Sequence, residues 1–421
     1  MARSRHSADW ILWGIPRYGN AHRTGRCATA RLGPAEPTPQ REATIAAPPP
    51  LQPRTPLLSL QVLRAVAALL VLVHHAAYDA GAIAARAGLP VPAPERFFDF
   101  GFGIHIFFVI SGFIMLRTAR GFGSARGAAT FAVRRLIRVV PLYWLLTSLV
   151  LIGAAVAPGL LNTPPGGPAV VLGSYLFVPV ARAGGEIRPV LGQGWTLDYE
   201  MFFYLLFALA MLLPRRRALP VLAGAMVGLV ALGRLVPAPV AAVAVWTDGL
   251  LLEFLFGLGL GLAAERGLAL TARQAAATVA LGAAGAVALG PLAGAEALLP
   301  AWASAGLPAA LVVAGCVLGP PWRRSGPVLA LAVVGDASYS LYLSHPFAVR
   351  LLRSAWVGLM PAGVAPGLYL GLACAAALGT ALALHRGVER PMTDWLQRRS
   401  RFAGPATRPI LPEVPAAPHR S

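Results

Sequence analysis

The stretch RAVAALLVLVHH, residues 64–75, places nine apolar residues between an arginine and two histidines. It lies within a longer apolar run, 57–79, which is long enough to cross the ~30 Å hydrocarbon core of a bilayer. Arginine and histidine are expensive in such a run, and they usually face a cavity or a partner inside a helical bundle. The stretch therefore predicts a membrane-spanning helix whose polar groups have a function.

The composition extends this prediction to the whole chain. Of 421 residues, 57% are hydrophobic and 13% are charged, whereas soluble domains carry about 25% charged residues. We expect an all-α, polytopic transmembrane helical bundle of about ten spanning helices, with segment 169–180 too short to span and either interfacial or re-entrant. The expected spans are 57–79, 100–117, 139–161, 197–213, 218–236, 247–265, 273–292, 301–319, 328–349 and 362–385.

The basic residues lie mostly between the apolar runs. The net charge is +19 and every one of the 36 basic residues is an arginine, a bias typical of a GC-rich genome. Nucleic-acid binding needs a basic soluble face, so we expect the lipid bilayer, and no nucleic acid, as a partner. If both termini are cytoplasmic, the inner loops hold most of the arginines, as the positive-inside rule requires. These inner residues include Arg117, Arg120, Arg126, Arg215, Arg216, Arg217, Arg266, Arg273, Arg323 and Arg324.

Three regions are expected along the chain. Residues 1–56 are rich in arginine, proline, threonine and alanine, and predict a disordered basic cytoplasmic tail, or an over-extended gene start. A membrane domain follows at 57–396, and a second disordered cytoplasmic tail at 397–421. Cysteine and histidine show no metal-ligand spacing, so no metal site is predicted.

The opening helix places its polar residues in a definite relation. Eleven residues make about three helical turns, so Arg64 and His75 lie roughly 20° apart and ~16 Å apart along the axis, while His74 points about 80° aside. In one interpretation, Arg64 snorkels to the inner interface and the histidines end the helix at the outer one. In the other, a shared channel has a basic inner mouth and a deeper imidazole that acts as a general base.

The next two apolar segments carry further polar groups. In GFGIHIFFVISGFIML, residues 101–116, His105 is expected at the outer end near His75, and Ser111 with Gly112 forms a notch suited to close helix packing. In FAVRRLIRVVPLYWLL, residues 131–146, three arginines occupy one or two turns. They either anchor the helix at the inner interface or clamp the phosphates of a cytosolic nucleotide-bearing donor. The three are Arg134, Arg135 and Arg138.

Two later segments place polar residues in apolar surroundings. In GQGWTLDYEMFFYLLF, residues 192–207, Asp198 and Glu200 stand where the apolar run begins, beside Trp195 and Tyr199. Acids there usually face a cavity or a partner, which favours a functional or paired role for Glu200. The stretch GDASYSLYLSHPF, residues 335–347, has a polar stripe for which a structural role is equally open. It ends at His345, and the following Pro346 is expected to break the helix ladder. The stretch HRGVERPMTDWL, residues 385–396, predicts an interfacial amphipathic end.

Six blocks of this sequence, taken together, resemble a known family. They are LQVLRAVAALLVLVHH, GIHIFFVISGFIM, RRLIRVVPLYWL, GWTLDYEMFFY, GDASYSLYLSHP and VERPM. In this order they are similar to the acyltransferase-3 integral-membrane O-acyltransferases, especially the branch that acetylates exopolysaccharides. The resemblance covers residues 58–396.

The resemblance implies acyl transfer from a cytosolic acyl-CoA, usually acetyl-CoA, to a hydroxyl of a glycan or glycolipid in a bacterial inner membrane. The acyl-CoA is then a co-substrate, and no tightly bound cofactor is implied. His75 matches the family's essential histidine and Arg64 its paired arginine. Arg135 and Arg138 match the RxxR element, and Glu200 matches the family's glutamate.

Two positions depart from the family pattern. His105 stands where the family often has aspartate, and Asp198 where this branch often has asparagine. Donor binding is expected at Arg134, Arg135 and Arg138. The acceptor is expected at Asp198, Trp195, Tyr199, His105 and His345.

Two other classes of protein remain open at the level of the sequence. A transporter of a glycan or lipid intermediate would also line a path with polar residues, although the two halves show no obvious internal repeat. A structural or sensory membrane protein would leave the polar groups inside the apolar runs unexplained.

Overall fold

The computed structural model describes residues 58–90, 98–157, 164–236, 240–289, 299–359 and 366–401. In these ranges the regular elements are helices, together with one isolated antiparallel bridge between Ala181 and Ile187. The all-α prediction is confirmed for this part of the chain. The expected tail at 1–56, and residues 402–421 of the second tail, lie outside the described residues.

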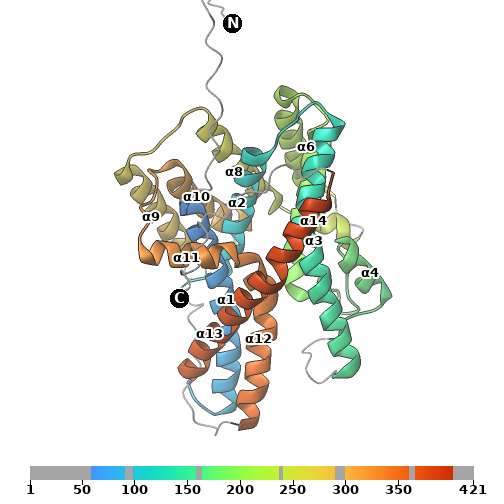
Figure 1. Ribbon diagram of the computed structural model, residues 1–421, viewed down its shortest axis with the longest axis vertical. Helices are drawn as coiled ribbons and strands as arrows, with labels where there is room; N and C mark the ends of the chain where they lie inside the picture. Colours follow the sequence, from blue (N-terminus) through green and yellow to red (C-terminus); the bar gives the residue numbers. More distant parts are fainter. Residues whose placement is uncertain are drawn as a thin grey trace, which may run out of the picture. The chain divides into compact units, whose positions relative to one another are not determined.

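Figure 1 shows the order of the helices along the chain. Two of them, η6 and η7, are single π-helical segments continuous with a neighbouring α-helix, and η3 is a 3₁₀ turn. The elements are α1 (Leu58–Arg86), α2 (Phe102–Thr118), α3 (Ala125–Val156), α4 (Pro168–Leu176), η3 (Gly192–Gly194), α5 (Trp195–Ala210), α6 (Arg215–Leu235), α7 (Ala241–Trp246), α8 (Leu251–Glu265), α9 (Ala272–Ala288), η6 (Trp302–Gly306), α10 (Leu307–Leu318), α11 (Gly326–Asp336), α12 (Ser338–Leu359), α13 (Pro366–Leu384), η7 (His385–Glu389) and α14 (Arg390–Arg399).

Fewer segments than expected have the length of a full membrane span. Among the described residues, five are long and apolar enough, and the bent pair α11–α12 makes a sixth if it counts as one span. The expected number of about ten is therefore not confirmed. For example, α5 and α9 have 16 and 17 residues, and at 1.5 Å per residue they fall short of a ~30 Å hydrocarbon core. The five are Leu58–Arg86, Ala125–Val156, Arg215–Leu235, Ala241–Glu265 and Pro366–Arg399.

Helix α1 packs against α2, α11, α12 and α13. Small residues allow these close approaches: a Cβ atom on Gly103 of α2 would lie 2.3 Å from the Ala67 carbonyl oxygen, and one on Gly335 of α11 would lie 1.9 Å from that of Gln61. Such distances exclude any larger residue, because protein interiors are already close-packed. The opening helix is thus a scaffold on which other helices are placed.

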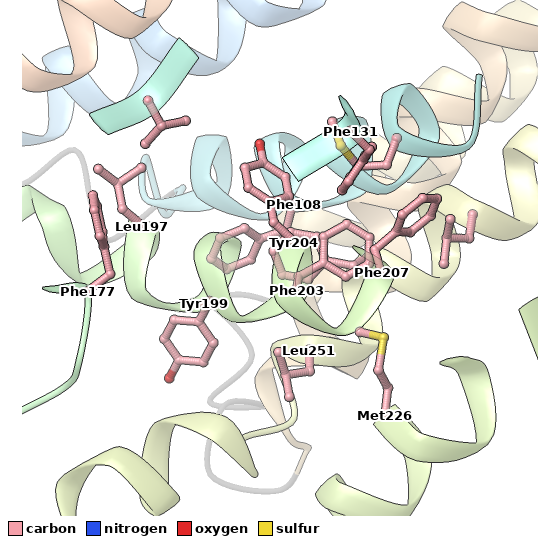
Figure 2. Packing of buried hydrophobic residues seen from close by; sticks show 14 of the residues in the cluster. Phe108, Phe131, Phe177, Leu197, Tyr199, Phe203, Tyr204, Phe207, Met226 and Leu251 are labelled. Atoms are coloured by element: carbon pink, nitrogen blue, oxygen red, sulfur yellow. The ribbon is translucent and has the colours of Figure 1, made fainter. Parts of the chain in front are cut away.

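Helices α2 and α8 cross at a pair of glycines. A Cβ atom on Gly112 would lie 2.0 Å from the carbonyl oxygen of Phe254, and one on Gly257 would lie 2.0 Å from that of Val109. The packing notch expected at Gly112 is therefore confirmed. Beside this crossing lies an aromatic core (Figure 2) in which the rings of Phe203 and Phe254 are stacked 4.4 Å apart.

The expected span at 328–349 is not one straight helix. The chain forms two helices, α11 and α12, that are bent by 73° relative to each other. Contacts with α1 hold both sides of the bend, because Gly335 lies against the backbone of Gln61 and Ser338 accepts a hydrogen bond from Arg64.

The expectation that Pro346 breaks the helix is also wrong. Helix α12 continues through this proline to Leu359. A proline removes one backbone N–H group from the ladder, and packed helices tolerate that loss when neighbouring groups satisfy the freed carbonyl.

The end of the membrane domain is one long helical segment. Helix α13 continues through the π-helical η7 into α14, which ends at Arg399. The stretch 385–396, expected to be an interfacial amphipathic end, thus forms η7 and most of α14, continuous with α13. Helix α14 packs beside α3, as Figure 1 also shows, and this packing places the residues of η7 near the arginines of α3.

Candidate functional site

A pocket of about 380 Å³ lies between α1, α2, α3, α5, the start of α12 and the end of α14. This volume falls within the range of small-molecule sites in proteins. The polar residues that line it are Arg64, Ser111, Thr118, Arg134, Arg135, Arg138, Thr196, Glu200, Tyr204, Ser338, Tyr339, Tyr342, Gln397 and Ser400. The pocket thus brings together residues that are far apart in the sequence.

Four arginines and one carboxylate, Glu200, are the charged groups among the described lining residues. Arg64 comes from α1, whereas Arg134, Arg135 and Arg138 come from the first half of α3. Guanidinium groups match the geometry of phosphate oxygens and form strong charge-assisted hydrogen bonds with them. A pocket with this charge suits a phosphate-bearing ligand.

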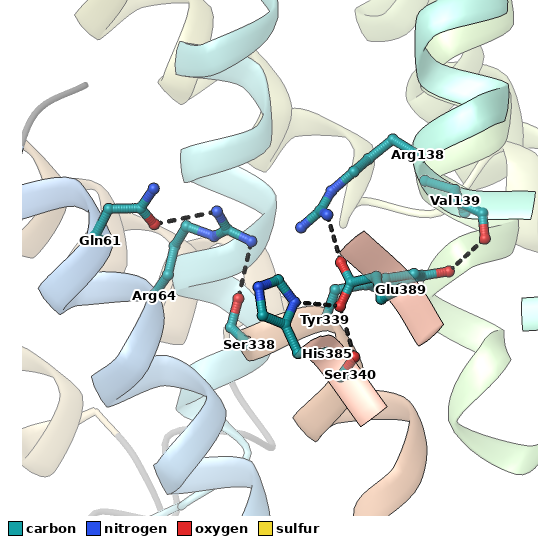
Figure 3. Close-up of polar contacts among 9 residues, drawn as sticks. All are labelled: Gln61, Arg64, Arg138, Val139, Ser338, Tyr339, Ser340, His385 and Glu389. Atoms are coloured by element: carbon teal, nitrogen blue, oxygen red, sulfur yellow. Dashed lines mark hydrogen bonds and ion pairs between the residues drawn. The ribbon is translucent and has the colours of Figure 1, made fainter. Parts of the chain in front are cut away.

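Arg138 is engaged by an acid that the sequence analysis missed. Its guanidinium forms an ion pair with Glu389 of η7, whose side chain is 1% exposed (Figure 3). Glu389 also accepts hydrogen bonds from the Ser340 hydroxyl at 2.5 Å and from the His385 Nδ1 atom at 2.8 Å. The signal in the sequence was an acid in the block VERPM next to the apolar run of α13. Because a buried charge needs partners, this network ties η7 to α3 and α12.

Arg64 and Arg135 have neutral partners. The Arg64 guanidinium donates to the Ser338 hydroxyl at 2.9 Å and to the Gln61 side-chain oxygen at 3.2 Å (Figure 3). Arg135 donates to the Thr118 hydroxyl at 3.3 Å, and its buried Nε atom has no partner in the described part of the chain. Arg64 and Arg135 therefore lack a carboxylate partner among the described residues, whereas the charge of Arg138 is paired with Glu389.

Glu200 is held by two hydroxyl groups. Ser111 of α2 donates to it at 2.7 Å, and Tyr204 one turn further along α5 donates to the same oxygen. Its hydrogen-bond partners among the described residues are therefore hydroxyl groups of α2 and α5.

His75 lies outside the lining of the pocket, although the sequence analysis placed it in one channel with Arg64. Its Nδ1 atom lies 2.9 Å from the carbonyl oxygen of Val71. A carbonyl only accepts, so Nδ1 carries the proton and the lone pair of the neutral ring is on Nε2. The ring of His345 is 4.9 Å from that of His75, so α1 and α12 bring two imidazoles together.

His105 has an acid as its partner. It contacts Glu253 of α8, with its Nδ1 atom 2.7 Å from a carboxylate oxygen, and the Glu253 side chain is fully buried. The other oxygen of Glu253 has no hydrogen-bond partner among the described residues. Glu253 was not among the site residues predicted from the sequence. The feature that could have indicated it is a single acid near the start of the apolar run 251–264. The pair links α2 to α8.

The remaining expected acceptor residues lie on the first turns of α5. Asp198 is 3% exposed, and its Oδ1 atom has no partner in the described ranges. The ring of Tyr199 lies 5.9 Å from the rings of both Trp195 and Phe108. These side chains are therefore beside the pocket, whose lining on this helix includes Thr196 and Glu200. Among the described residues, no group of three or more histidine, cysteine, aspartate or glutamate side chains is placed to hold a metal ion.

Comparison with known proteins adds two findings. A family model described as "Acyltransferase domain", from the acyltransferase-3 group, matches residues 57–386. The chain is also 35% identical over 314 residues to the exopolysaccharide production protein ExoZ of Rhizobium meliloti (strain 1021), a match that covers 71% of this chain and 94% of that protein. No solved structure matches the chain significantly.

Proposed function

The chain belongs to the acyltransferase-3 family of membrane acyltransferases, and from this premise we propose that it transfers an acetyl group from acetyl-CoA to a hydroxyl of an exopolysaccharide or another cell-surface glycan. Its similarity to an exopolysaccharide production protein supports a glycan as the acceptor. The proposal places the enzyme in a bacterial inner membrane with both termini in the cytoplasm, so that the arginines meet the cytosolic donor.

The observation that carries the proposal is the gathering of four arginines around one pocket of about 380 Å³. Acyl-CoA carries several phosphate groups on its nucleotide, and arginine forks hold phosphates through paired hydrogen bonds. Arg134 and Arg135 are assigned to these phosphates, with Arg64 deeper along the pocket. Arg138 assists mainly through the field of the cluster, because Glu389 occupies its guanidinium.

The histidine performs the chemistry in this proposal. The Nε2 atom of His75 takes the proton of the acceptor hydroxyl while the hydroxyl oxygen attacks the thioester carbonyl carbon. The carbon–sulfur bond then breaks, and the CoA thiolate takes the proton back from the imidazolium. A positioned general base contributes typically ~10²–10⁴ in rate. The bond from Nδ1 to the Val71 carbonyl supports this role, since it leaves Nε2 as the basic atom.

The acceptor is assigned to the first turns of α5 and to His345 of α12. Trp195 and Tyr199 supply aromatic faces that can pack on the apolar face of a sugar while their polar tips face its hydroxyls. Asp198, Glu200 and His345 are assigned to the acceptor hydroxyl groups. His105 is left out of this set because it is engaged with Glu253.

The full-length chain, purified in detergent micelles, tests the proposal. We expect free CoA to appear with acetyl-CoA and the glycan of the producing cell, one acetyl ester to form on the glycan per CoA released, and the His75→Ala variant to lose both signals. A protein that carries the glycan across vesicle membranes but releases no CoA is a transporter, and that result would refute the proposal. In cells, loss of the gene should lower the ester content of the surface glycan.

A further inference from the structure

The pocket has an aromatic end opposite its arginines. Along α2 it is lined from Thr118, which contacts Arg135, back to Ile104, a distance of about 21 Å along the helix axis. Near the Ile104 end, the rings of Phe107 and Tyr342 meet at a centroid distance of 6.2 Å and an angle of 65°. These two rings, from α2 and α12, line the pocket at the end away from Arg135.

The ring of Tyr342 is fixed by hydrogen bonds to the start of α5. Its hydroxyl donates to the carbonyl oxygen of Gln193 at 3.0 Å and lies 2.8 Å from the hydroxyl of Thr196. The residue is 7% exposed. A buried ring whose hydroxyl is held by two hydrogen bonds does not move without breaking them in a site of low polarity, where hydrogen bonds are strong.

The two imidazoles lie behind this ring. Tyr342 and His345 are three residues apart on one face of α12, with ring centroids 6.4 Å apart. His345 in turn contacts His75. Tyr342 lines the pocket, whereas neither histidine does. The order along this path is therefore arginines, Tyr342, His345 and His75.

We propose that Tyr342, backed by Phe107, determines the length of the acyl group that the enzyme accepts. This inference rests on the proposed function. A thioester that enters from the arginines with its acyl chain leading brings that chain up to the rings of Tyr342 and Phe107, which lie on the side of the pocket toward His345 and His75. An acetyl group adds one methyl there, whereas each further methylene would overlap the ring in a close-packed site. One methylene in such a pocket discriminates by about 10–200-fold.

The test compares acyl chain lengths in the purified full-length protein. Initial rates of CoA release, with the glycan present, give kcat/KM for acetyl-, butanoyl- and hexanoyl-CoA. Tyr342→Ala removes the ring and should raise the butanoyl-to-acetyl ratio at least about tenfold. Tyr342→Phe keeps the ring but loses the hydroxyl, and should raise the ratio less. Tyr369→Phe is the matched control, because it removes a buried hydroxyl that donates to the Val349 carbonyl away from the pocket, and its ratio should be that of the parent.

Several results would overturn the inference. An unchanged ratio in folded Tyr342→Ala refutes it while leaving the proposed function intact. If this variant does not accumulate, Phe107→Leu supplies the same comparison, and an unchanged ratio there has the same meaning. Folded Tyr342→Phe protein with no turnover would assign the hydroxyl to the chemistry itself and refute a filter. A parent protein that releases no CoA from any acyl-CoA refutes the proposed function, and this inference with it.

Discussion

The imidazole ring of His345 meets that of His75 at a centroid distance of 4.9 Å and an angle of 64°. Each ring uses its Nδ1 atom to bond the carbonyl oxygen four residues earlier, Val71 for His75 and Leu341 for His345. Both lone pairs are consequently on Nε2, and that of His345 is buried without a partner among the described residues. A buried polar atom without a hydrogen-bond partner is destabilising. Such atoms are rare in folded proteins, and a functional role is one reason for their presence.

The first prediction separates the two adjacent histidines of α1. His75→Ala should lower the rate of glycan ester formation at least ~10²-fold, the low end for loss of a general base. His74→Ala should have a much smaller effect, because its ring meets His75 but points away from the Arg64 face. Ester content, normalised to the amount of protein in the membrane, measures both. An inactive His74→Ala with an active His75→Ala would reverse the assignment.

The second prediction concerns His345, which is assigned to the acceptor and contacts the His75 ring. His345→Asn removes the ring next to His75 and should lower kcat at least about tenfold, since a misplacement of about 1 Å at a reacting group can cost ~10² in rate. The KM for acetyl-CoA should stay unchanged, because the donor pocket does not include His345. A rise in the KM for acetyl-CoA at constant kcat would instead place His345 in binding of the donor alone.

The third prediction divides the arginines of α3. Arg134→Ala with Arg135→Ala should raise the KM for acetyl-CoA more than it lowers kcat, because these groups are assigned to phosphates and not to the reacting carbon. Direct binding of CoA to the purified variant gives an independent reading. A variant with the parent's KM and only a lower kcat would show that the pair has another role.

Arg138 should behave differently from its neighbours. Removing one partner of a buried ion pair typically destabilises by about 3–5 kcal/mol, so Arg138→Ala and Glu389→Gln should both lower the unfolding temperature in detergent. Glu265→Gln is the control, since its ion pair with Arg215 is partly exposed and such pairs contribute about 0–1 kcal/mol. Equal stability of the Glu389 and Glu265 variants would contradict the structural role given to the Arg138–Glu389 pair.

The fourth prediction tests the buried pair that links α2 to α8. His105→Ala leaves the fully buried Glu253 carboxylate without its partner and should lower the unfolding temperature. His105→Asp should lower it further, because two carboxylates then meet in a buried site. Exchange of the two residues, His105→Glu with Glu253→His, should recover part of the loss. Additive effects in this cycle would show that the two side chains do not interact.

The fifth prediction is topological. The arginine distribution places the turn before α3 in the cytoplasm and the end of α1 outside. In a background in which Cys27, Cys316 and Cys374 are replaced by serine, Arg126→Cys should react with an impermeant thiol reagent only after the membrane is opened, whereas Arg86→Cys should react in intact cells. Labelling of residue 126 in intact cells would invert the map and remove the donor assignment.

The sequence determined the helical class of the protein, its membrane character and the identity of the charged groups in the pocket. Apolar runs can be recognised locally, because the length that spans a bilayer and the cost of a charge in it depend only on neighbouring residues. For the same reason Arg64, Glu200 and the arginines of α3 stood out as exceptions in their own runs. The packing notch at Gly112 could also be predicted from the sequence, since it depends on residue size alone.

Only the tertiary structure decided which of these groups meet. Glu389 forms an ion pair with Arg138 at a separation of 251 residues in the sequence. Glu253 contacts His105 at a separation of 148 residues. The bend between α11 and α12 is set by contacts with α1, and not by Pro346. Neither the Arg138–Glu389 pair nor the His105–Glu253 pair can be predicted from neighbouring residues, because the free energy of a buried charge depends on the groups that other helices place beside it. The helical period therefore placed Arg64 and His75 on one face, but the ring of Tyr342, arriving from a third helix, separates the pocket at Arg64 from the imidazole at His75.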